Sequence, residues 1–553
     1  MTKARKYILA GVLLLAFLLR VYGLTLYPVG FTADEASFGY DAYSMLKTGN
    51  DQWGHKLPLV LESFGDFKAP LYSYIDIPFV AIMGLNRLAV RLPGALIGVA
   101  SVVVVYFLAK YLIRDTRYSI LASLLLAISP WHIQLSRGAF ESNLASFFLP
   151  LGIFLFLKGL KKKNYLALAA LFLGLNMFTY HSAKVVTPLV VFFLVVLYRK
   201  ELKKFSPHHF FASLIFVVFL LLTAFTFFQG AGRRAADVSI FRGALEAQAQ
   251  ARLEAIESGT NENVAKLLHN QYLTVLDRFI FNYKTYFSVD FLFSQGVREA
   301  TYGMMPQIGV LYWFELPLLI SFLVYLIFHR KEKYLQIILF WLLVAPIPAS
   351  LTSGVGHAGN RAAVMLPALQ IAGAFGAYYM SNFLQQKIKQ KYYLIAIASF
   401  VIIVGISTVS FVKTYILESP IKVAQGMLYG NLEAAHWLSQ NGVRYEKIVV
   451  SRSLSEPQIF IGFANKWNPT EYQKETLDWN RYKAENYKFL DQLDSYSLGR
   501  YEFKSIMPKD FVSPNTLVVA RPEEFSDDVV PLKVFHYPDG DPSIFIVSAQ
   551  EYN

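Results

Sequence analysis

YILAGVLLLAFLLRVYGLTL, residues 7–26, is the stretch that decides the fold. It is apolar apart from Arg20, and it follows three basic residues, Lys3, Arg5 and Lys6. A helix needs about 20 mostly apolar residues to cross the hydrocarbon core of a bilayer, and this run meets that requirement. We therefore expect it to form the first span of an integral membrane protein.

The composition of the whole chain agrees with this expectation. Its 553 residues are 55% hydrophobic and 16% charged, whereas soluble domains carry about 25% charged residues. Cysteine is absent, which excludes a disulfide framework, Cys-ligated zinc and a thiol nucleophile. We expect the net charge of +13 to orient the loops of a membrane protein, and we predict no nucleic-acid partner.

Ten further apolar stretches predict spans, at residues 90–110, 116–131, 142–160, 164–181, 185–199, 208–228, 308–329, 333–351, 361–384 and 392–414. Their connections alternate in charge. The N-terminal trio and five basic clusters (110–117, 158–163, 199–204, 330–333 and 387–391) hold about 20 positive charges, against about five in the alternate short loops. All basic clusters face the cytoplasm only if the short stretch 70–84 lies on the membrane as an interfacial helix.

The predicted fold is therefore mainly α, a polytopic transmembrane bundle of about 11 spans with its N-terminus in the cytoplasm. We expect the bundle to occupy residues 1–414, with a first outer loop of interfacial helices at 27–89 and a long outer loop at 229–307. Residues 415–553 should form a small α/β domain outside the cytoplasmic membrane. Its helix is expected near 432–440 and its strands at 447–451, 458–464, 516–520, 530–537 and 543–549.

Polar residues gather at the outer ends of the predicted spans. Because such residues are costly near a membrane, these clusters are candidates for a functional site. Asp34 and Glu35 open the first outer segment, although a helix cap and a first-turn charge would explain them too. Lys68 precedes an interfacial helix and could bind an anion there or contact lipid headgroups. Further candidates on the same face are Tyr72, Arg137, Glu141, His181, Lys184, His357 and Arg361.

Together these residues suit one kind of reaction. Cations would hold the anionic phosphate of a lipid leaving group, and a carboxylate would take the proton of an acceptor hydroxyl. Individually each residue also has a structural explanation; for example, Glu141 could pair with Arg137 at spacing i, i+4. The chain has no P-loop and no dinucleotide fingerprint, so we expect a lipid-linked donor rather than a nucleotide sugar.

Four local patterns resemble the glycosyltransferase C superfamily, in the branch of protein O-mannosyltransferases and the bacterial aminoarabinose transferase of lipid A. They are ADEASFGYDAYSMLKTG (33–49), FKAPLYSYIDIPFVAIMGLNRLAVRLPGALIG (67–98), RGAFESNLASFF (137–148) and GNRAAVMLPALQ (359–370). The resemblance covers about the first 190 residues and then scattered positions up to residue 384.

The resemblance implies a role for several of these residues. Asp34 would be the general base for the acceptor, with Glu35 supporting it or binding a metal. Lys68 would bind the donor phosphate, assisted by Arg361. Glu141 stands where this branch usually has an aspartate, and it is a third catalytic candidate. His181 and Lys184 have no family equivalent and are candidates from the topology alone.

The long outer loop holds two expected surface helices, 236–257 and 262–281, and then an aromatic run. Loops of this length are often lids, and the run could cover a polyprenyl chain or a sugar; anchoring at the interface is the alternative. Arg298 is a further phosphate candidate. A divalent metal could bind among Asp34, Glu35, Glu141 and His357, but no spacing motif enforces a site.

The sequence thus predicts a membrane glycosyltransferase. It would move a sugar from a polyprenyl-phosphate donor to an extracytoplasmic lipid, glycan or protein, by a single displacement with inversion. A transporter or flippase of lipid-linked sugars and a non-catalytic scaffold that binds lipid-linked glycans are the alternatives. A transporter should have midplane charges and two related halves, and Glu315 is the main residue of that kind.

Overall fold

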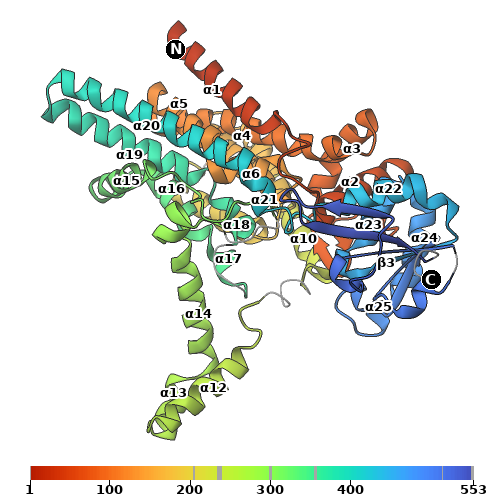
Figure 1. Cartoon of the computed structure of the whole chain (residues 1–553). Coiled ribbons are helices and arrows are strands. Elements are labelled where there is room, and N and C mark those ends of the chain that lie inside the picture. The colour runs from red at the N-terminus through yellow and green to blue at the C-terminus, as the bar shows by residue number, and fades with distance from the viewer. Residues whose placement is uncertain are drawn as a thin grey trace.

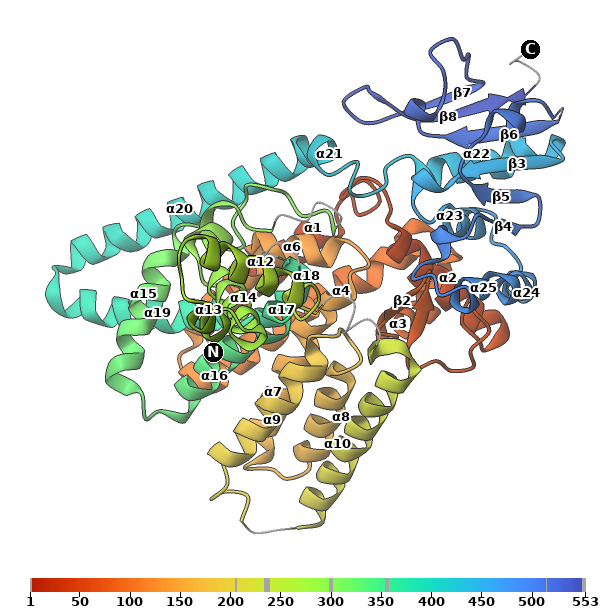
Figure 2. The same cartoon turned by 90° about the horizontal axis from the view of Figure 1, so that it is seen from below.

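The computed structural model of the chain describes residues 2–203, 206–232, 239–297, 302–353, 358–513 and 515–549. Figure 1 shows a large helical body, an α/β region at its side, and an arm of helices that projects away from the body. Figure 2 shows the same parts from below, with the sheet at the far edge of the α/β region.

Each apolar stretch predicted as a span contains a helix. The helices of the body are α1 (Lys3–Val21), α4 (Arg87–Ile113), α5 (Thr116–Ile128), α6 (Pro130–Arg137), α7 (Ala145–Gly159), α8 (Tyr165–Asn176), α9 (Ala183–Leu197), α10 (Pro207–Thr226), α15 (Glu315–His329), α16 (Lys333–Val344), α17 (Ile347–Ser350), α18 (Gly359–Ala362), α19 (Ala368–Lys387) and α20 (Gln390–Leu417).

Within the described residues, five helical segments are long and apolar enough to cross a membrane, or seven if each of two bent helix pairs forms one span. The bent pairs are α5 with α6, at 55°, and Gly359–Met365 with α19, at 46°. Four shorter apolar helices accompany them. These helices support a multi-pass membrane protein, whereas the number of eleven spans and their orientation stay predictions.

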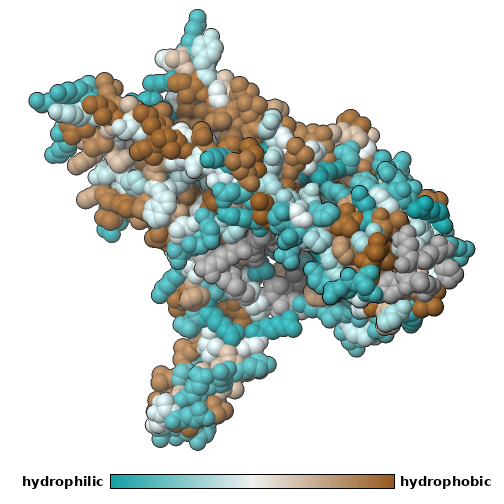
Figure 3. All heavy atoms as spheres, viewed as in Figure 1, coloured by the Kyte–Doolittle hydropathy of each residue, from teal (hydrophilic) through white to brown (hydrophobic). Residues whose placement is uncertain are grey.

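The surface of the body is apolar where α20 is exposed. Val401, Ile402, Ile406 and Val409 are all largely exposed on that helix. Figure 3 shows hydrophobic residues gathered over the helical body and hydrophilic residues more frequent over the α/β region and the arm. Because an exposed apolar surface of this size is unfavourable in water, lipid is the environment that suits it.

The first outer segment folds into α2 (Ala33–Thr48), a hairpin of β1 (Leu61–Ser63) and β2 (Asp66–Lys68), and α3 (Leu71–Met83). Gly49, at φ 76°, ends α2 in the left-handed conformation that glycine adopts without steric cost. Helix α3 occupies the stretch predicted to be interfacial. With 13 residues, it is shorter than a perpendicular span requires.

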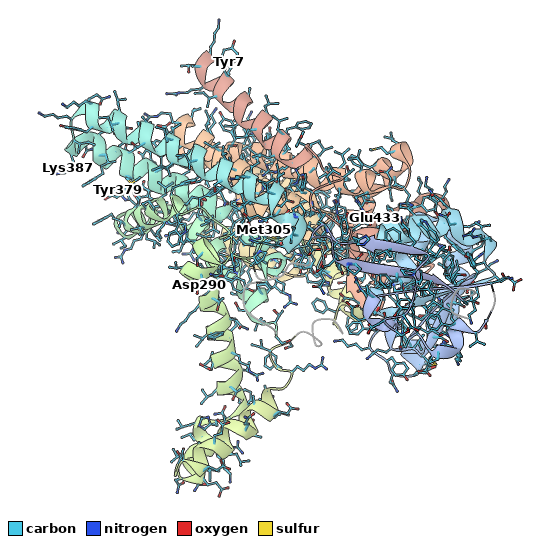
Figure 4. All side chains as sticks on the ribbon, viewed as in Figure 1. Tyr7, Asp290, Met305, Tyr379, Lys387 and Glu433 are labelled. Atoms are coloured by element: carbon cyan, nitrogen blue, oxygen red, sulfur yellow. The ribbon has the colours of Figure 1, made fainter. Side chains whose placement is uncertain are left out.

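The long outer loop forms the arm, from α12 (Ala244–Glu257), α13 (Glu262–Leu268) and α14 (Gln271–Thr285). The helix expected at 262–281 is in fact two helices. The side chain of Asn270 caps α14 by accepting from the backbone N–H of Leu273, and so a new helix starts there. Figure 4 labels Asp290 where the arm joins the body.

The C-terminal region contains one mixed sheet with strand order β4-β5-β3-β6-β8-β7. Strand β3 is parallel to β5 and β6, and the other pairs are antiparallel. The elements are α21 (Ser419–Lys422), α22 (Asn431–Asn441), β3 (Lys447–Ser451), α23 (Pro457–Ala464), α24 (Pro469–Trp479), α25 (Arg481–Ala484), β4 (Ser495–Leu498), β5 (Tyr501–Lys504), β6 (Thr516–Ala520), β7 (Lys533–His536) and β8 (Pro542–Ser548).

The strand predicted at 458–464 is wrong, because this segment is the helix α23. After Gln458 its residues are all apolar, since the helix is buried between α2 and α22, and such a run cannot be told from a buried strand by periodicity. Pro457 at the first helical position is the local feature that favours a helix. The other four predicted strands are present as β3, β6, β7 and β8.

One hydrophobic core joins the α/β region to the first outer segment. It contains Phe31 and Phe38 around α2 together with Phe460, Phe463 and Ile544 of the C-terminal region. The rings of Phe31 and Phe463 lie 5.2 Å apart. The two regions are therefore packed as one unit, and the division at residue 415 stays a prediction. Figure 4 labels Glu433 at this junction, where its carboxylate accepts from Arg87 at 2.7 Å.

Candidate functional site

The start of α2 fixes the direction of its two carboxylates. The Thr32 side chain accepts from the backbone N–H of Glu35, and the Glu35 side chain accepts from the backbone N–H of Thr32. This reciprocal arrangement is a capping box. Neighbouring residues on a helix point about 100° apart, so Asp34 faces solvent while Glu35 faces the interior.

Glu35 is part of a fully buried ion pair. Its carboxylate accepts from Arg91 Nε at 2.8 Å and from Arg91 Nη2 at 3.0 Å, and both side chains are 0% exposed. The backbone N–H of Ala139 donates to it as well. Arg91 uses its remaining donors on the carbonyls of Leu24, Pro28 and Gly30. Glu35 thus holds α2 against α4 and the preceding loop.

Asp34 pairs with Lys68 across the site. Lys68 Nζ lies 3.2 Å from Asp34 Oδ1, with Lys68 only 3% exposed and Asp34 42% exposed. The ammonium also lies 4.5 Å from the centre of the Phe38 ring and 5.8 Å from that of Phe64. Cation–π contacts of this kind stabilise a buried ammonium. The predicted proximity of Asp34 and Lys68 is therefore observed.

His181 holds the strand that carries Lys68. Its Nε2–H donates to the carbonyl of Phe67 at 2.8 Å. Gly230 supports the same strand from the other side, since at φ 119° it brings its backbone against the Phe67 ring, where a Cβ atom would lie 2.4 Å away.

Glu141 lies close to this pair. It begins the short helix η1 (Glu141–Leu144), is nearly buried, and interacts electrostatically with both Asp34 and Lys68. The next residue, Ser142, donates to Asn360 Oδ1 at 3.3 Å and so connects η1 to α18. Arg361 on α18 is half-buried and donates to Thr352 Oγ1 at 2.8 Å.

Three other candidates are engaged with the scaffold. Arg137 donates to the carbonyls of Leu19, Tyr22, Gly23 and Tyr27, and so it caps the end of α1. The Tyr72 hydroxyl donates to the carbonyl of Val90 and accepts from the backbone N–H of Gly94. Lys184 is buried and donates to Thr226 Oγ1 at 3.1 Å.

Two candidates, Arg298 and His357, lie outside the described residues. Within the described part of the chain, no group of three or more His, Asp and Glu side chains is arranged to hold a metal ion. Asp34 and Glu35 point in different directions, which explains why these adjacent carboxylates do not form a metal site.

A pocket of about 320 Å³ opens beside Asp34. It lies between the start of α2, the β1–β2 hairpin and the C-terminal region. Its described lining consists of Thr32, Ala33, Asp34, Ser63, Phe64, Asp66, Tyr302, Gly426, Leu428, Ser455, Glu456 and Phe489. Glu456 could not be selected from sequence, because no motif surrounds it and it lies more than 400 residues from Asp34.

Residues 67–223 match the protein family described as dolichyl-phosphate-mannose-protein mannosyltransferase. This range contains Lys68, Glu141 and His181. The comparison with curated proteins gave no match.

Solved structures share the fold over most of the chain. ArnT from Cupriavidus metallidurans, bound to undecaprenyl phosphate, is 10% identical, with 98% of this chain and 97% of that chain covered and a TM-score of 0.51. The Archaeoglobus fulgidus oligosaccharyltransferase tethered with an acceptor peptide is 13% identical, with 98% and 74% covered and a TM-score of 0.52.

The archaeal oligosaccharyltransferase AglB from the same organism, in complex with an inhibitory peptide and a dolichol-phosphate, is 15% identical. Its alignment covers 84% of this chain with a TM-score of 0.50, and this chain spans only 64% of its length. The family match over residues 67–223 and the fold shared with these structures confirm the predicted resemblance.

Proposed function

We propose that the chain is a membrane glycosyltransferase that takes its sugar from a polyprenyl-phosphate donor and transfers it to an extracytoplasmic acceptor. The observation that carries this proposal is Asp34, which lines a pocket beside the apolar helical body and pairs with the buried Lys68 behind it. The fold agrees with it, since ArnT, which shares that fold, binds undecaprenyl phosphate.

The donor phosphate would bind at Lys68. An ammonium has three N–H donors, and Lys68 uses one of them on Asp34. Because Lys68 is almost fully buried, its charge is weakly screened and acts strongly on a phosphate that reaches it. Lys68 would thereby stabilise the negative charge that develops on the leaving phosphate.

Asp34 would act on the acceptor. It is the more exposed partner of the pair and faces the pocket, where an acceptor hydroxyl can approach it. The hydroxyl oxygen attacks C1 of the sugar, the bond between C1 and the phosphate oxygen breaks with its electron pair going to the phosphate, and Asp34 takes the hydroxyl proton. A single displacement of this kind inverts the configuration at C1.

Binding of undecaprenyl phosphate, the kind of lipid phosphate that remains after the donor has lost its sugar, tests the proposal most directly. We expect the wild-type protein in lipid nanodiscs to bind undecaprenyl phosphate, and Lys68→Met to bind it at least about tenfold more weakly, because the phosphate loses its buried cation. Lys47→Met, which removes an exposed lysine from the last turn of α2, is the matched control and should bind like wild type. Equal binding by wild type and Lys68→Met would contradict the proposal, as would no binding at all.

A further inference from the structure

The pocket contains a carboxylate that the proposed reaction does not use. Glu456 lines the pocket together with Asp34, and the two interact electrostatically. It immediately precedes α23, in the C-terminal region, while Asp34 belongs to α2. Figure 1 shows α23 beside α2, and the two helices contact each other. The pocket therefore has acidic residues on walls built from distant parts of the chain.

Buried neighbours hold Glu456 in this place. Gln458 Nε2 donates to Glu456 Oε2 at 3.0 Å, and the Tyr496 hydroxyl donates to Gln458 Oε1 at 2.7 Å. Gln458 and Tyr496 are themselves buried. Ser455 and Glu456 both have left-handed backbones, at φ 53° and 54°. This conformation is uncommon for residues other than glycine and is found at functional sites more often than elsewhere.

The lining of the pocket suits a neutral, hydroxyl-rich ligand. Three carboxylates line it, those of Asp34, Asp66 and Glu456, and among its described lining residues none is Lys, Arg or His. An ionised carboxylate only accepts hydrogen bonds, so hydroxyl groups are good partners and an anionic ligand is a poor one. Aromatic rings add flat apolar surface, from Phe64, Tyr302 and Phe489.

We propose that Glu456 is an acceptor-binding residue, which accepts hydrogen bonds from the hydroxyl groups of a neutral carbohydrate acceptor. This inference rests on the proposed function and goes further, because it assigns a chemical class to the acceptor. Glu456 would bind and select the acceptor, while Asp34 takes its proton.

The charge of Glu456 should make this selection depend on pH. Burial above all, together with Asp491 and Asp34, raises the pKa of Glu456 to about 8 against the opposing effects of Gln458 and Lys68. Two tyrosines also face it, Tyr472 and Tyr496. Glu456 is therefore mostly neutral at pH 6.5 and ionised at pH 9, where an anionic acceptor is repelled most strongly.

Two methyl glycosides that differ by one charge test this inference. We expect wild-type protein in nanodiscs at pH 9 to bind methyl β-glucoside about tenfold more tightly than methyl β-glucuronide, as measured by saturation-transfer NMR, because like charges in one site repel. The preference should shrink at pH 6.5. In Glu456→Gln it should be weaker than in wild type at pH 9 and equal at both pH values, since the charge of Asp34 and Asp66 remains while that of Glu456 is absent.

A surface variant and a donor measurement complete the design. Glu485→Gln removes an exposed carboxylate from the same region and should keep the wild-type preference at both pH values. Undecaprenyl phosphate should bind equally well to wild type and Glu456→Gln, because Lys68 is intact. If it fails to bind wild type, the proposed function fails.

If undecaprenyl phosphate binds but neither glycoside does, the carbohydrate assignment is overturned. A pH-dependent preference that persists in Glu456→Gln would overturn the role of Glu456 alone.

Discussion

Two ion pairs at the start of α2 differ in their access to solvent. Glu35 and Arg91 are 0% exposed and satisfy each other and the surrounding backbone. Asp34 and Lys68 join at 3.2 Å, with Asp34 42% exposed at the edge of a pocket. The two acidic residues are adjacent in sequence, yet one stabilises the fold and the other is available for chemistry. Burial, rather than residue type, distinguishes them.

Asp34→Asn should produce the largest effect on function. The amide keeps the size of the side chain but cannot take the acceptor proton, so donor turnover should fall about 10²- to 10⁴-fold. The thermal unfolding temperature should fall less than in Glu35→Gln, because Asp34 is 42% exposed and solvent partly screens its interaction with Lys68. Turnover and thermal unfolding of the same preparation check this. Retained turnover would show that Asp34 is not the base, and the two pairs would then not differ in function.

Glu35→Gln should have its main effect on stability rather than on turnover. The substitution leaves Arg91 buried without its counter-ion, and breaking a buried pair in this way costs about 3–5 kcal/mol of unfolding free energy. Denaturant unfolding in detergent micelles measures this loss. The double variant Glu35→Gln with Arg91→Met should regain part of the stability, because no uncompensated charge remains. A Glu35→Gln protein as stable as wild type would show that this pair does not stabilise the fold.

Glu456 extends the comparison to a carboxylate in the same pocket with no buried cation of its own. Its pKa is raised to about 8, so the folded protein holds a proton there that the unfolded chain releases above about pH 4.5. The unfolding free energy should therefore fall as pH rises through this range, at up to about 1.4 kcal/mol per unit.

Thermal unfolding of wild type and Glu456→Gln between pH 5 and 8.5 measures this effect. The variant should be less sensitive to pH than wild type, and its advantage should grow as pH rises. Parallel curves for the two proteins would show that the carboxyl does not change its proton affinity on folding.

The exposed pair Lys422–Glu418 should give the smallest effect. Its atoms are 2.7 Å apart, closer than Asp34 and Lys68, but both side chains are exposed. Exposed pairs contribute little to stability because solvent screens their charges, so Glu418→Gln should leave the unfolding free energy almost unchanged in the same denaturant measurement. A loss comparable to that of Glu35→Gln would contradict the view that burial, and not distance, decides the contribution.

Much of the helical body could be predicted, because an apolar run long enough for a bilayer leaves few alternatives to a helix. The segment 458–464 was mispredicted for a related reason. Burial on all sides makes every position of α23 after Gln458 apolar, and then neither the period of a strand nor that of a helix can be read.

Only the part of the site that lies within one segment of the sequence could be predicted. Asp34 and Lys68 belong to one outer segment, so their proximity followed from topology. Arg91 as the partner of Glu35 depends on how α4 is rotated against α2, which no local pattern records. The same holds for Glu456, because its place in the pocket results from the packing of α23 onto α2.

The apolar interior shared by α2 and the C-terminal sheet has a consequence for how such a protein can diverge. Phe31 and Phe463 pack against each other across that interior. A Cβ atom on Gly39 of α2 would lie 2.4 Å from Val90 and 3.0 Å from Phe463, so a larger residue there would force its neighbours to move. A foreign C-terminal region could not be grafted onto these spans unless α2 changed with it. Since α2 also carries Asp34, the proposed base, an exchange that alters the proposed acceptor must preserve or rebuild α2 in the same step.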